Sequence, residues 1–236
     1  MSYDVFADDI SAIKVDLERK QIINTINPHS YVIAKHDALF EKALRDSNTL
    51  LPDGSGIVMA AKHCNGKVIH KIAGYDLHTH LLKLLNEQSG SCFYMGSSNE
   101  TLDKVKERIT RECPNIRTGF YSPPYKAQFS DEDNRVIVDM IQAFKPDVLF
   151  IGLTAPKQEK WLNAYKDQLD FKIASSIGAV FDFYAGTVKR PSQFWVNLHL
   201  EWFPRLIKEP KRLWKRNFVS TPLFLKDVLK CKMRKK

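Results

Sequence analysis

The sequence predicts an α/β protein built on a mostly parallel β-sheet with helices on both faces. Three observations favour this fold class. Short apolar runs alternate with amphipathic helical patterns along most of the 236 residues, as in successive β–α units. Polar loops, several with glycine, follow four of the apolar runs. A basic segment of helical character comes after the last apolar run and adds a C-terminal appendage.

Strand and helix signals alternate through residues 20–113. Apolar runs bounded by turn residues indicate strands, and apolar residues at spacings of three and four indicate helices. Gly66 is a plausible C-cap and Asn99 a possible N-cap. In order, the expected elements are a strand over 20–27, a helix over 30–47, a strand end and Pro-Asp-Gly turn over 48–56, helices over 57–66 and 75–88, a strand and glycine turn over 91–98, and a helix over 99–113.

The second half continues the alternation and ends in the appendage. Ser130 and Asp133 form a capping box at the start of one helix. The expected elements are a helix over 130–146, a buried strand over 147–153, a helix over 157–169, one or two strands within 171–183, and helix from about residue 192 onward. We therefore divide the chain into a core over 1–190 and a basic helical appendage over 191–236.

The positive charge of the chain is concentrated in this appendage. Of the 36 Lys and Arg residues, 14 lie at or after Lys189, but only 3 of the 27 Asp and Glu residues do. The body is near neutral, so the tail is expected to meet a local anionic partner.

Other sequence signals narrow the class of protein. No uncharged apolar run reaches the roughly 18 residues of a membrane span, and the acidic N-terminus lacks the pattern of a signal peptide. The four cysteines have no metal-binding spacing and are expected to be reduced thiols: Cys64, Cys92, Cys113 and Cys231.

The four loops that follow predicted strands cover residues 24–27, 52–56, 95–98 and 152–159. In a parallel sheet such loops share one edge and converge on one crevice. Glycines there permit close backbone approach, and the N-termini of the following helices attract phosphate. This layout is generic for nucleotide sites. The chain has neither the Gly-x-Gly-x-x-Gly nor the Walker A pattern, which argues against a nicotinamide enzyme and an ATPase.

Polar residues of these loops are the candidate site residues, and each has a structural alternative. Asp53 is either an Asx-turn carboxylate or a general base at a strand end. Thr25 and Asn27 are either turn or cap residues or ligands of a substrate. Gln158 and Glu159 open a helix, where a glutamate is often a favourable first-turn charge. Asp182, in an apolar segment read as strand, favours a ligand or network role.

Metal binding has weaker support. His78 and His80 lack a third ligand and are expected to be surface or cap residues. The segment Asp131-Glu132-Asp133 has the DxD form that chelates a metal on a sugar nucleotide, but its position after Ser130 favours helix capping.

Six cations of the tail recur at helical spacings: Arg205, Lys208, Lys211, Arg212, Lys215 and Arg216. Aromatic and aliphatic residues, among them Trp202 and Trp214, lie between them. Three interpretations are open: a solvated helix packed on the body, a nucleic-acid-binding segment, or a helix on a membrane surface. No nucleic-acid-reading module accompanies the charge, whereas the aromatic residues suit a membrane surface.

Several of these motifs together resemble the WecG/TagA/CpsF family of bacterial glycosyltransferases over nearly the whole chain. The matching segments are Thr25–Asn27, Pro52–Gly56, Lys71–Asp76, Tyr94–Gly96, Gly152–Glu159 with Trp161, Phe181–Gly186 with Lys189-Arg190, Glu201-Trp202, Arg205-Leu206, Glu209-Pro210 and Arg212–Trp214. The resemblance implies a Rossmann-like core with a C-terminal appendage that reaches the membrane and completes the active site.

The resemblance also implies a reaction. Such enzymes transfer an N-acetylmannosamine-type sugar, or a uronic acid or glucose, from a UDP donor to a polyprenyl-diphosphate-linked saccharide, with inversion and without a metal or other cofactor. The implied partners are these two substrates and the membrane surface, not nucleic acid, and a homo-oligomer is possible. The implied location is the inner face of the bacterial cell membrane. The alternative class is a non-enzymatic module that binds anionic lipid or nucleic acid.

The resemblance assigns roles residue by residue. Asp53 matches the base that deprotonates the acceptor, with Thr25 and Asn27 holding the sugar or acceptor. Arg205, Arg212 and Arg216 are matched to stabilisation of the departing UDP. Five residues are matched to contacts with the donor: Gln158, Glu159, Asp182, Gly152 and Gly96.

Overall fold

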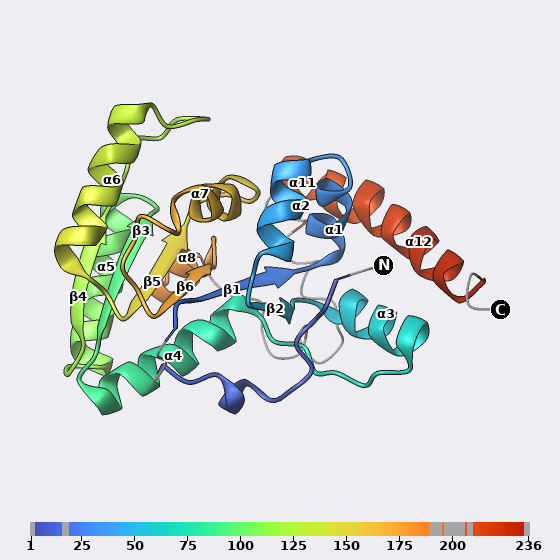
Figure 1. Cartoon of the computed structure of the whole chain (residues 1–236), viewed down its shortest axis with the longest axis horizontal. Helices are drawn as coiled ribbons and strands as arrows, with labels where there is room; N and C mark the ends of the chain where they lie inside the picture. The colour runs from blue at the N-terminus through green and yellow to red at the C-terminus, as the bar shows by residue number, and fades with distance from the viewer. Residues whose placement is uncertain (1–2, 16–18, 189–194, 196–205, 207–209, 234–236) are drawn as a thin grey trace.

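The computed structural model of this protein describes residues 3–15, 19–188, 195, 206 and 210–233. Its centre is a sheet of six parallel strands in the order β2-β1-β6-β5-β3-β4 (Figure 1). The strands are β1 (Gln21–Ile26), β2 (Thr49–Pro52), β3 (Ser91–Gly96), β4 (Arg117–Tyr121), β5 (Val148–Gly152) and β6 (Ile173–Ser176). The predicted α/β class with a parallel sheet is confirmed.

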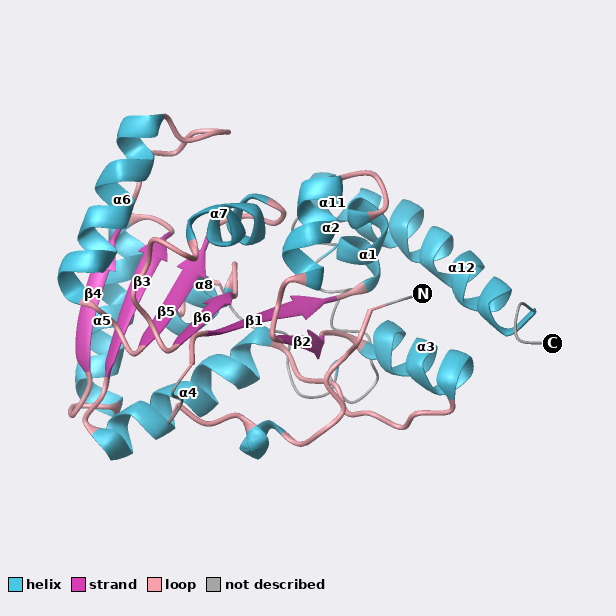
Figure 2. Cartoon of the chain, viewed as in Figure 1, coloured by secondary structure: helices cyan, strands magenta, loops and turns pink. Residues whose placement is uncertain are grey.

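Helices cover the sheet on both faces (Figure 2). The helices α4 (Gly74–Gln88), α5 (Asn99–Glu112) and α8 (Val180–Ala185) share one apolar cluster with the sheet. The helices α6 (Asp131–Phe144) and α7 (Lys157–Tyr165) share another cluster on the opposite face. The strands are therefore buried on both sides, which explains their almost uninterrupted apolar character.

Successive residues of one strand pack alternately into the two apolar clusters on opposite faces of the sheet. In β3, Tyr94 packs with α4 and α5, whereas Phe93 and Met95 pack with α6. In β1, Ile23 belongs to the first cluster and Ile22 to the second. The face of any strand residue follows from this alternation.

A third cluster lies beyond the ends of β1 and β2. It joins α1 (Pro28–Ala34), α2 (Ala38–Arg45) and α3 (Ser55–Asn65) to the C-terminal helix α12 (Thr221–Met233). The helix α11 (Pro210–Trp214) and a π-helical turn, η2 (Lys215–Ser220), lead directly into α12. A short 3-10 helix, η1 (Ile10–Ala12), lies near the N-terminus.

The structure corrects three of the expected elements. The helix expected over 30–47 is two helices, because Asp37 caps α2 by accepting a hydrogen bond from Phe40 N at 3.0 Å. The strand expected to reach residue 183 stops at Ser176, and Val180–Ala185 is the helix α8. The strand β4 was not predicted, because it is a half-buried edge strand with Gly119 at its centre.

Two capping signals are confirmed. Gly66 ends α3 in the left-handed conformation, with φ of 69°. Ser130 and Asp133 form the capping box of α6. At α5, however, the N-cap is Ser98, one residue before the expected Asn99.

The C-terminal helix contributes to the core of the protein. Phe224 is fully buried, Val228 is 3% exposed, and both belong to the third cluster. Asp227 of the same helix pairs with Lys35 at 2.6 Å and accepts a hydrogen bond from the Tyr31 hydroxyl at 3.2 Å. Helix α12 is thus docked on α1 by apolar and polar contacts.

We predict that Phe224→Ala lowers the free energy of unfolding by about 3–5 kcal/mol, because a buried ring is lost and a cavity is left. Urea denaturation measures this change. The matched control is Leu229→Ala on the same helix, where the side chain is 64% exposed, and a change within about 0.5 kcal/mol is expected. Equal effects of the two substitutions would contradict the docking of α12.

Candidate functional site

The carboxyl ends of the strands form one edge of the sheet, and the predicted loop residues lie along it. Asn27 follows β1 and Asp53 follows β2, while Gly96 and Gly152 are the last residues of β3 and β5. Parallel pairing brings them to a common edge, as expected from the sequence.

The connections of β3 and β5 leave the sheet in opposite directions. The chain passes from β3 through α5 to β4, and from β5 through α7 to β6. Such a point, where two adjacent strands send their connections apart, is where open α/β sheets form a ligand crevice. The candidate crevice therefore lies at the ends of β3 and β5.

Two glycines end β3 and β5, where the backbone is closely packed. Gly96 and Gly152 are register partners. Gly96 has φ of 121°, and a Cβ there would lie 2.5 Å from the carbonyl oxygen of Gly152. A Cβ on Gly152 would lie 2.5 Å from the ring of Phe181. Both positions require glycine, because a Cβ would overlap the Gly152 backbone or the Phe181 ring.

Asp182 lies beside this crevice, but on a helix. The strand interpretation of its segment is wrong, because Val180, Phe181 and Tyr184 use helical spacing to bury one side of α8. Asp182 is half-buried, and its Oδ1 accepts a hydrogen bond from Thr101 Oγ1 at 3.4 Å. Thr101 is in the first turn of α5, directly after the β3 loop. Asp182 is thereby held next to the N-terminus of α5.

A second group of candidates lies at the ends of β1 and β2. The Asp53 backbone N–H donates to Ile26 O at 2.9 Å and ties the two loops together. Asp53 and Thr25 are both half-buried. Asn27 caps α1, and its Oδ1 accepts hydrogen bonds from His29 N and Ser30 N, both at 3.0 Å. The side-chain oxygen of Asn27 is therefore used to cap α1, as one of the two sequence interpretations predicts.

The two groups occupy different parts of one edge. Strands β1 and β6 separate β2 from β5, and strand spacing of about 4.8 Å puts their ends roughly 14 Å apart. A ligand that contacts both Asp53 and Gly152 must extend across several strands.

Gln158 and Glu159 are buried between these two groups, in the first turn of α7. They are 5% and 4% exposed, and Gln158 Nε2 donates to Glu159 Oε1 at 2.9 Å. Glu159 does lie in the first turn of α7, as expected, but it is buried there. Burial raises the pKa of Glu159 to about 7, since an apolar environment disfavours the ionised carboxylate.

The tail arginines are described to different extents. Arg205 lies outside the described residues, and Arg212 is placed only by its backbone in α11. Arg216 is half-buried in η2. Burial, and then the nearby charge of Arg216, lower the pKa of His29. Residues 24–26, expected as part of a loop, belong to strand β1. His29 lies in the first turn of α1, just after the end of β1, so the fold brings Arg216 to the Asp53 end of the edge.

No sequence motif singles out Thr101 or His29 as a site residue. Thr101 holds Asp182 in place, and His29 Nδ1 lies 2.8 Å from Ser220 Oγ, which links the β1 loop to the tail. Both are ordinary helix-start residues in sequence, so only the fold reveals these contacts.

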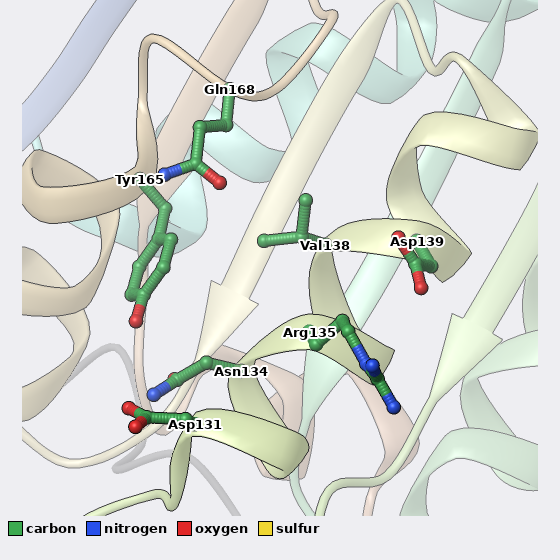
Figure 3. Close-up of a pocket in the computed structure, with 7 residues that line it drawn as sticks. All are labelled: Asp131, Asn134, Arg135, Val138, Asp139, Tyr165 and Gln168. Carbon is green, nitrogen blue, oxygen red and sulfur yellow. The ribbon is translucent and has the colours of Figure 1, made fainter.

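The sequence alternatives for metal binding have structural explanations. Asp133 accepts a hydrogen bond from Ser130 N and pairs with Lys126 at 2.7 Å, so it serves capping. Asp131 lines a pocket of about 260 Å³ beside α6 and the end of α7 (Figure 3), which contains none of the predicted site residues. The described residues contain no group of three or more His, Cys, Asp or Glu side chains able to hold a metal.

The expectation of a surface position for His78 is wrong. His78 is fully buried in a cluster of aromatic rings, and its Nε2 lies 2.7 Å from the Tyr94 hydroxyl. Burial lowers the pKa of His78 to about 3. His80 Nε2 lies 2.8 Å from Ile13 O. Both histidines therefore serve packing.

Comparison with known proteins gives consistent relatives. The family model described as "Glycosyl transferase WecG/TagA/CpsF family" matches residues 1–236. The N-acetylglucosaminyldiphosphoundecaprenol N-acetyl-beta-D-mannosaminyltransferase of Bacillus subtilis (strain 168) is 33% identical over 231 residues, covering 98% of this chain and 88% of that protein. Transferases of the same name from Bacillus spizizenii (32% identity, 95% and 85% coverage) and Staphylococcus aureus strain MRSA252 (27% identity, 90% and 81% coverage) are also similar.

Proposed function

Because the chain belongs to the WecG/TagA/CpsF family of glycosyl transferases, we propose that it moves an N-acetylmannosamine-type sugar from a UDP donor to a polyprenyl-diphosphate-linked saccharide. The named relatives act on N-acetylglucosaminyldiphosphoundecaprenol, and the same acceptor class is proposed here. The product would enter the synthesis of a bacterial cell-surface polysaccharide.

The observation that carries this proposal is the arrangement of the carboxyl edge. The candidate crevice at the ends of β3 and β5 and the Asp53 carboxylate after β2 lie on one edge, separated by two strands. An extended nucleotide sugar fits this arrangement, with its nucleotide at the crevice and its sugar toward Asp53. Gly96, Gly152 and Asp182 would line the nucleotide pocket, and Gln158 would contact the donor.

The proposed reaction is a single inverting displacement. Asp53 takes the proton from the acceptor hydroxyl while that oxygen attacks the anomeric carbon, and the bond to UDP breaks. Thr25 and Asn27 would hold the sugar or acceptor beside Asp53. The departing diphosphate gains negative charge, which Arg205, Arg212 and Arg216 would stabilise. The position of Arg216 near His29 supports this role for one of the three.

We predict that Asp53→Ala lowers the transfer rate by a factor on the order of 10²–10⁴, because a general base contributes about this much. Transfer from UDP-N-acetylmannosamine to a lipid-diphosphate-N-acetylglucosamine analogue measures the rate, and titration calorimetry measures UDP binding, which should persist. The control is Asp167→Ala, an exposed carboxylate just beyond α7. Near-normal turnover by the Asp53 variant would exclude the base assignment.

We also propose that transfer needs no metal ion. The cationic tail side chains would replace a metal at the leaving diphosphate. The expected result is unchanged turnover after treatment with EDTA and assay in metal-free buffer. Complete loss of activity with EDTA, restored by magnesium, would contradict this and direct attention to Asp131 and Asp133.

The tail helices have the surface that a membrane contact requires. Trp214, Phe218 and Leu229 are 55%, 53% and 64% exposed, and the rings of Trp214 and Phe218 lie 5.2 Å apart. Lys226 and Lys230 on α12 are exposed next to these apolar residues. Among the described residues, no helix has both the length and the apolar character to cross a bilayer. We propose that this surface lies on the inner face of the cell membrane.

We predict that Leu229→Asp weakens binding to phosphatidylglycerol-containing vesicles about tenfold or more, because an exposed leucine can contribute about 1.5–3 kcal/mol when buried in lipid. Vesicle co-sedimentation measures the binding. The matched control is Leu39→Asp on α2, where the leucine is 66% exposed, and no change is expected. Equal binding of the Leu229 variant and the wild type would refute this contact surface.

A further inference from the structure

The pair Gln158 and Glu159 has more buried hydrogen-bond acceptors than donors. Beyond the bond from Gln158 Nε2 to Glu159 Oε1, neither Gln158 Oε1 nor Glu159 Oε2 has a partner within the described part of the chain. Both atoms are buried, and leaving a buried polar atom unpaired costs about 1–3 kcal/mol. A ligand, an ordered water or a protonated carboxyl group can supply the missing hydrogen-bond donor.

Two strand residues add to this deficit. Asn24 in β1 and Ser176 in β6 are each 1% exposed, and Asn24 Oδ1 and Ser176 Oγ also have no partner among the described residues. Alternation along the strands places them on the same face as Ile22 and Ala174. That face is the one covered by α7. Asn24 Nδ2 donates to Ser47 Oγ at 3.0 Å. On the α7 face, these four residues therefore leave three acceptor oxygens and one hydroxyl group without a partner among the described residues.

Protonation of Glu159 reduces the shortage of hydrogen-bond donors in this group, and ionisation of Glu159 increases it. The protonated carboxyl group supplies an O–H donor and can still accept the bond from Gln158 Nε2. Among the described residues no cation contributes to the pKa of Glu159, so the ionised carboxylate would be an uncompensated buried charge. The pKa shift of Glu159 has burial as its cause, with no contribution from a neighbouring charge. Geometry and burial therefore favour the same, uncharged form.

The charged groups on the surrounding elements are engaged elsewhere. On α7, Lys160 pairs with Asp37 of α2 at 2.9 Å, and Lys166 contacts Asp46 at 3.2 Å. Lys157 Nζ donates to Lys126 O at 2.7 Å. Strand β6 carries no ionisable side chain. On α6, Asp133 pairs with Lys126, and Asp131 lines the separate pocket.

The buried carbonyl oxygen of Gln158 lies beside the backbone of the loop that follows β6. A Cβ built on Gly178, just beyond β6, would lie 3.5 Å from Gln158 Oε1 and 3.4 Å from Leu153 O. Since Nε2 is directed to Glu159, the carbonyl oxygen is the atom left for a ligand. It can accept a hydrogen bond from a hydroxyl group of a sugar.

We propose that Glu159 is a positioning residue that, in its uncharged form, fixes the amide of Gln158 so that Oε1 accepts a hydrogen bond from a hydroxyl group of the donor sugar. This inference rests on the proposed function for the identity of the ligand. The link between Glu159 and Gln158 does not, because it is present in the free protein. The site favours a neutral group that carries a hydroxyl, because the acceptor oxygens of Gln158 and Glu159 would repel an anion.

The first experiment needs no substrate. The side-chain amide of Gln158 is followed by NMR between pH 5.5 and 8.5, assigned with Gln158→Ala. In the wild type, the Gln158 amide resonance is expected to shift with a midpoint near pH 7. In Glu159→Gln the resonance is expected to stay constant, because the new side chain keeps the hydrogen-bond acceptor and remains neutral at every pH. A Gln158 resonance that does not titrate in the wild type, or titrates equally in Glu159→Gln, overturns the proposal.

The second experiment measures the kinetic consequence. With UDP-N-acetylmannosamine as the varied substrate, the wild-type KM is expected to rise about tenfold above pH 7 as Glu159 ionises, while Glu159→Gln keeps a constant KM. Glu132→Gln, an exposed first-turn glutamate of α6, is the matched control and should follow the wild type. A merely structural role would change thermal stability but not the pH dependence of KM.

A double variant tests whether Glu159 acts through Gln158. Glu159→Gln should remove the pH dependence of KM in the wild-type background and have no effect in the Gln158→Ala background. An equal effect in both backgrounds overturns the positioning role. Titration of the Gln158 amide without any transfer from UDP-sugars would uphold the positioning link and refute the proposed function instead.

Discussion

Parallel pairing of all six strands is the constraint on which the candidate site depends. Each strand must return to the same starting edge, so every carboxyl end, with its loop, is delivered to the other edge. Residues as distant in sequence as Asn27, Asp53 and Gly152 are brought to that one edge for this reason alone. The candidates that follow strands reach the edge through the topology of the sheet, whereas the tail arginines come from the C-terminal appendage.

The same constraint explains where polar residues are tolerated inside the sheet. Burial on both faces makes an internal polar side chain costly unless it is bonded. Ser175 meets this requirement by donating to Ile23 O at 2.6 Å. Asn24 meets it in part, because Nδ2 donates to Ser47 Oγ while Oδ1 is unpaired, and Ser176 Oγ has no partner among the described residues. Four of the seven unpaired buried atoms in the described part of the chain belong to Asn24, Gln158, Glu159 and Ser176, and the others belong to His63, His78 and Asn217. Unsatisfied polar groups of this kind are the local conflicts that a fold can retain for function.

The sequence predicts this architecture well wherever apolar pattern and burial agree. The strands of the core and the long helices α4, α5 and α6 follow from it, as does the common edge of the four loops. The pattern fails in short segments. The run Val180–Ala185 is too short to separate strand from helix by periodicity. For this reason the sequence predicts a strand around Asp182 where the structure has the helix α8. The edge strand β4 is half-buried and carries little signal.

The sequence also does not predict which single polar residues are buried. A glutamate at the start of a helix has the same local sequence whether it faces solvent or the sheet, and Glu159 faces the sheet. His78 likewise occupies a helix position whose burial depends on α8, a helix about 100 residues further along the chain. Such cases need tertiary contacts. Local sequence could supply the residue types of the site but not the protonation state that burial imposes on them.

The C-terminal helix joins the proposed membrane surface to the candidate active site through direct packing. A Cβ on Gly56 would lie 2.7 Å from Pro28 Cγ and 3.6 Å from the Phe224 ring, so the turn after Asp53, the start of α1 and α12 meet at one point. The opposite side of α12 carries the exposed leucines. Interiors packed at this density transmit displacement instead of absorbing it. The position of α12 and the position of the Asp53 turn are therefore mutually constrained, and the appendage shapes the same edge that the strands define.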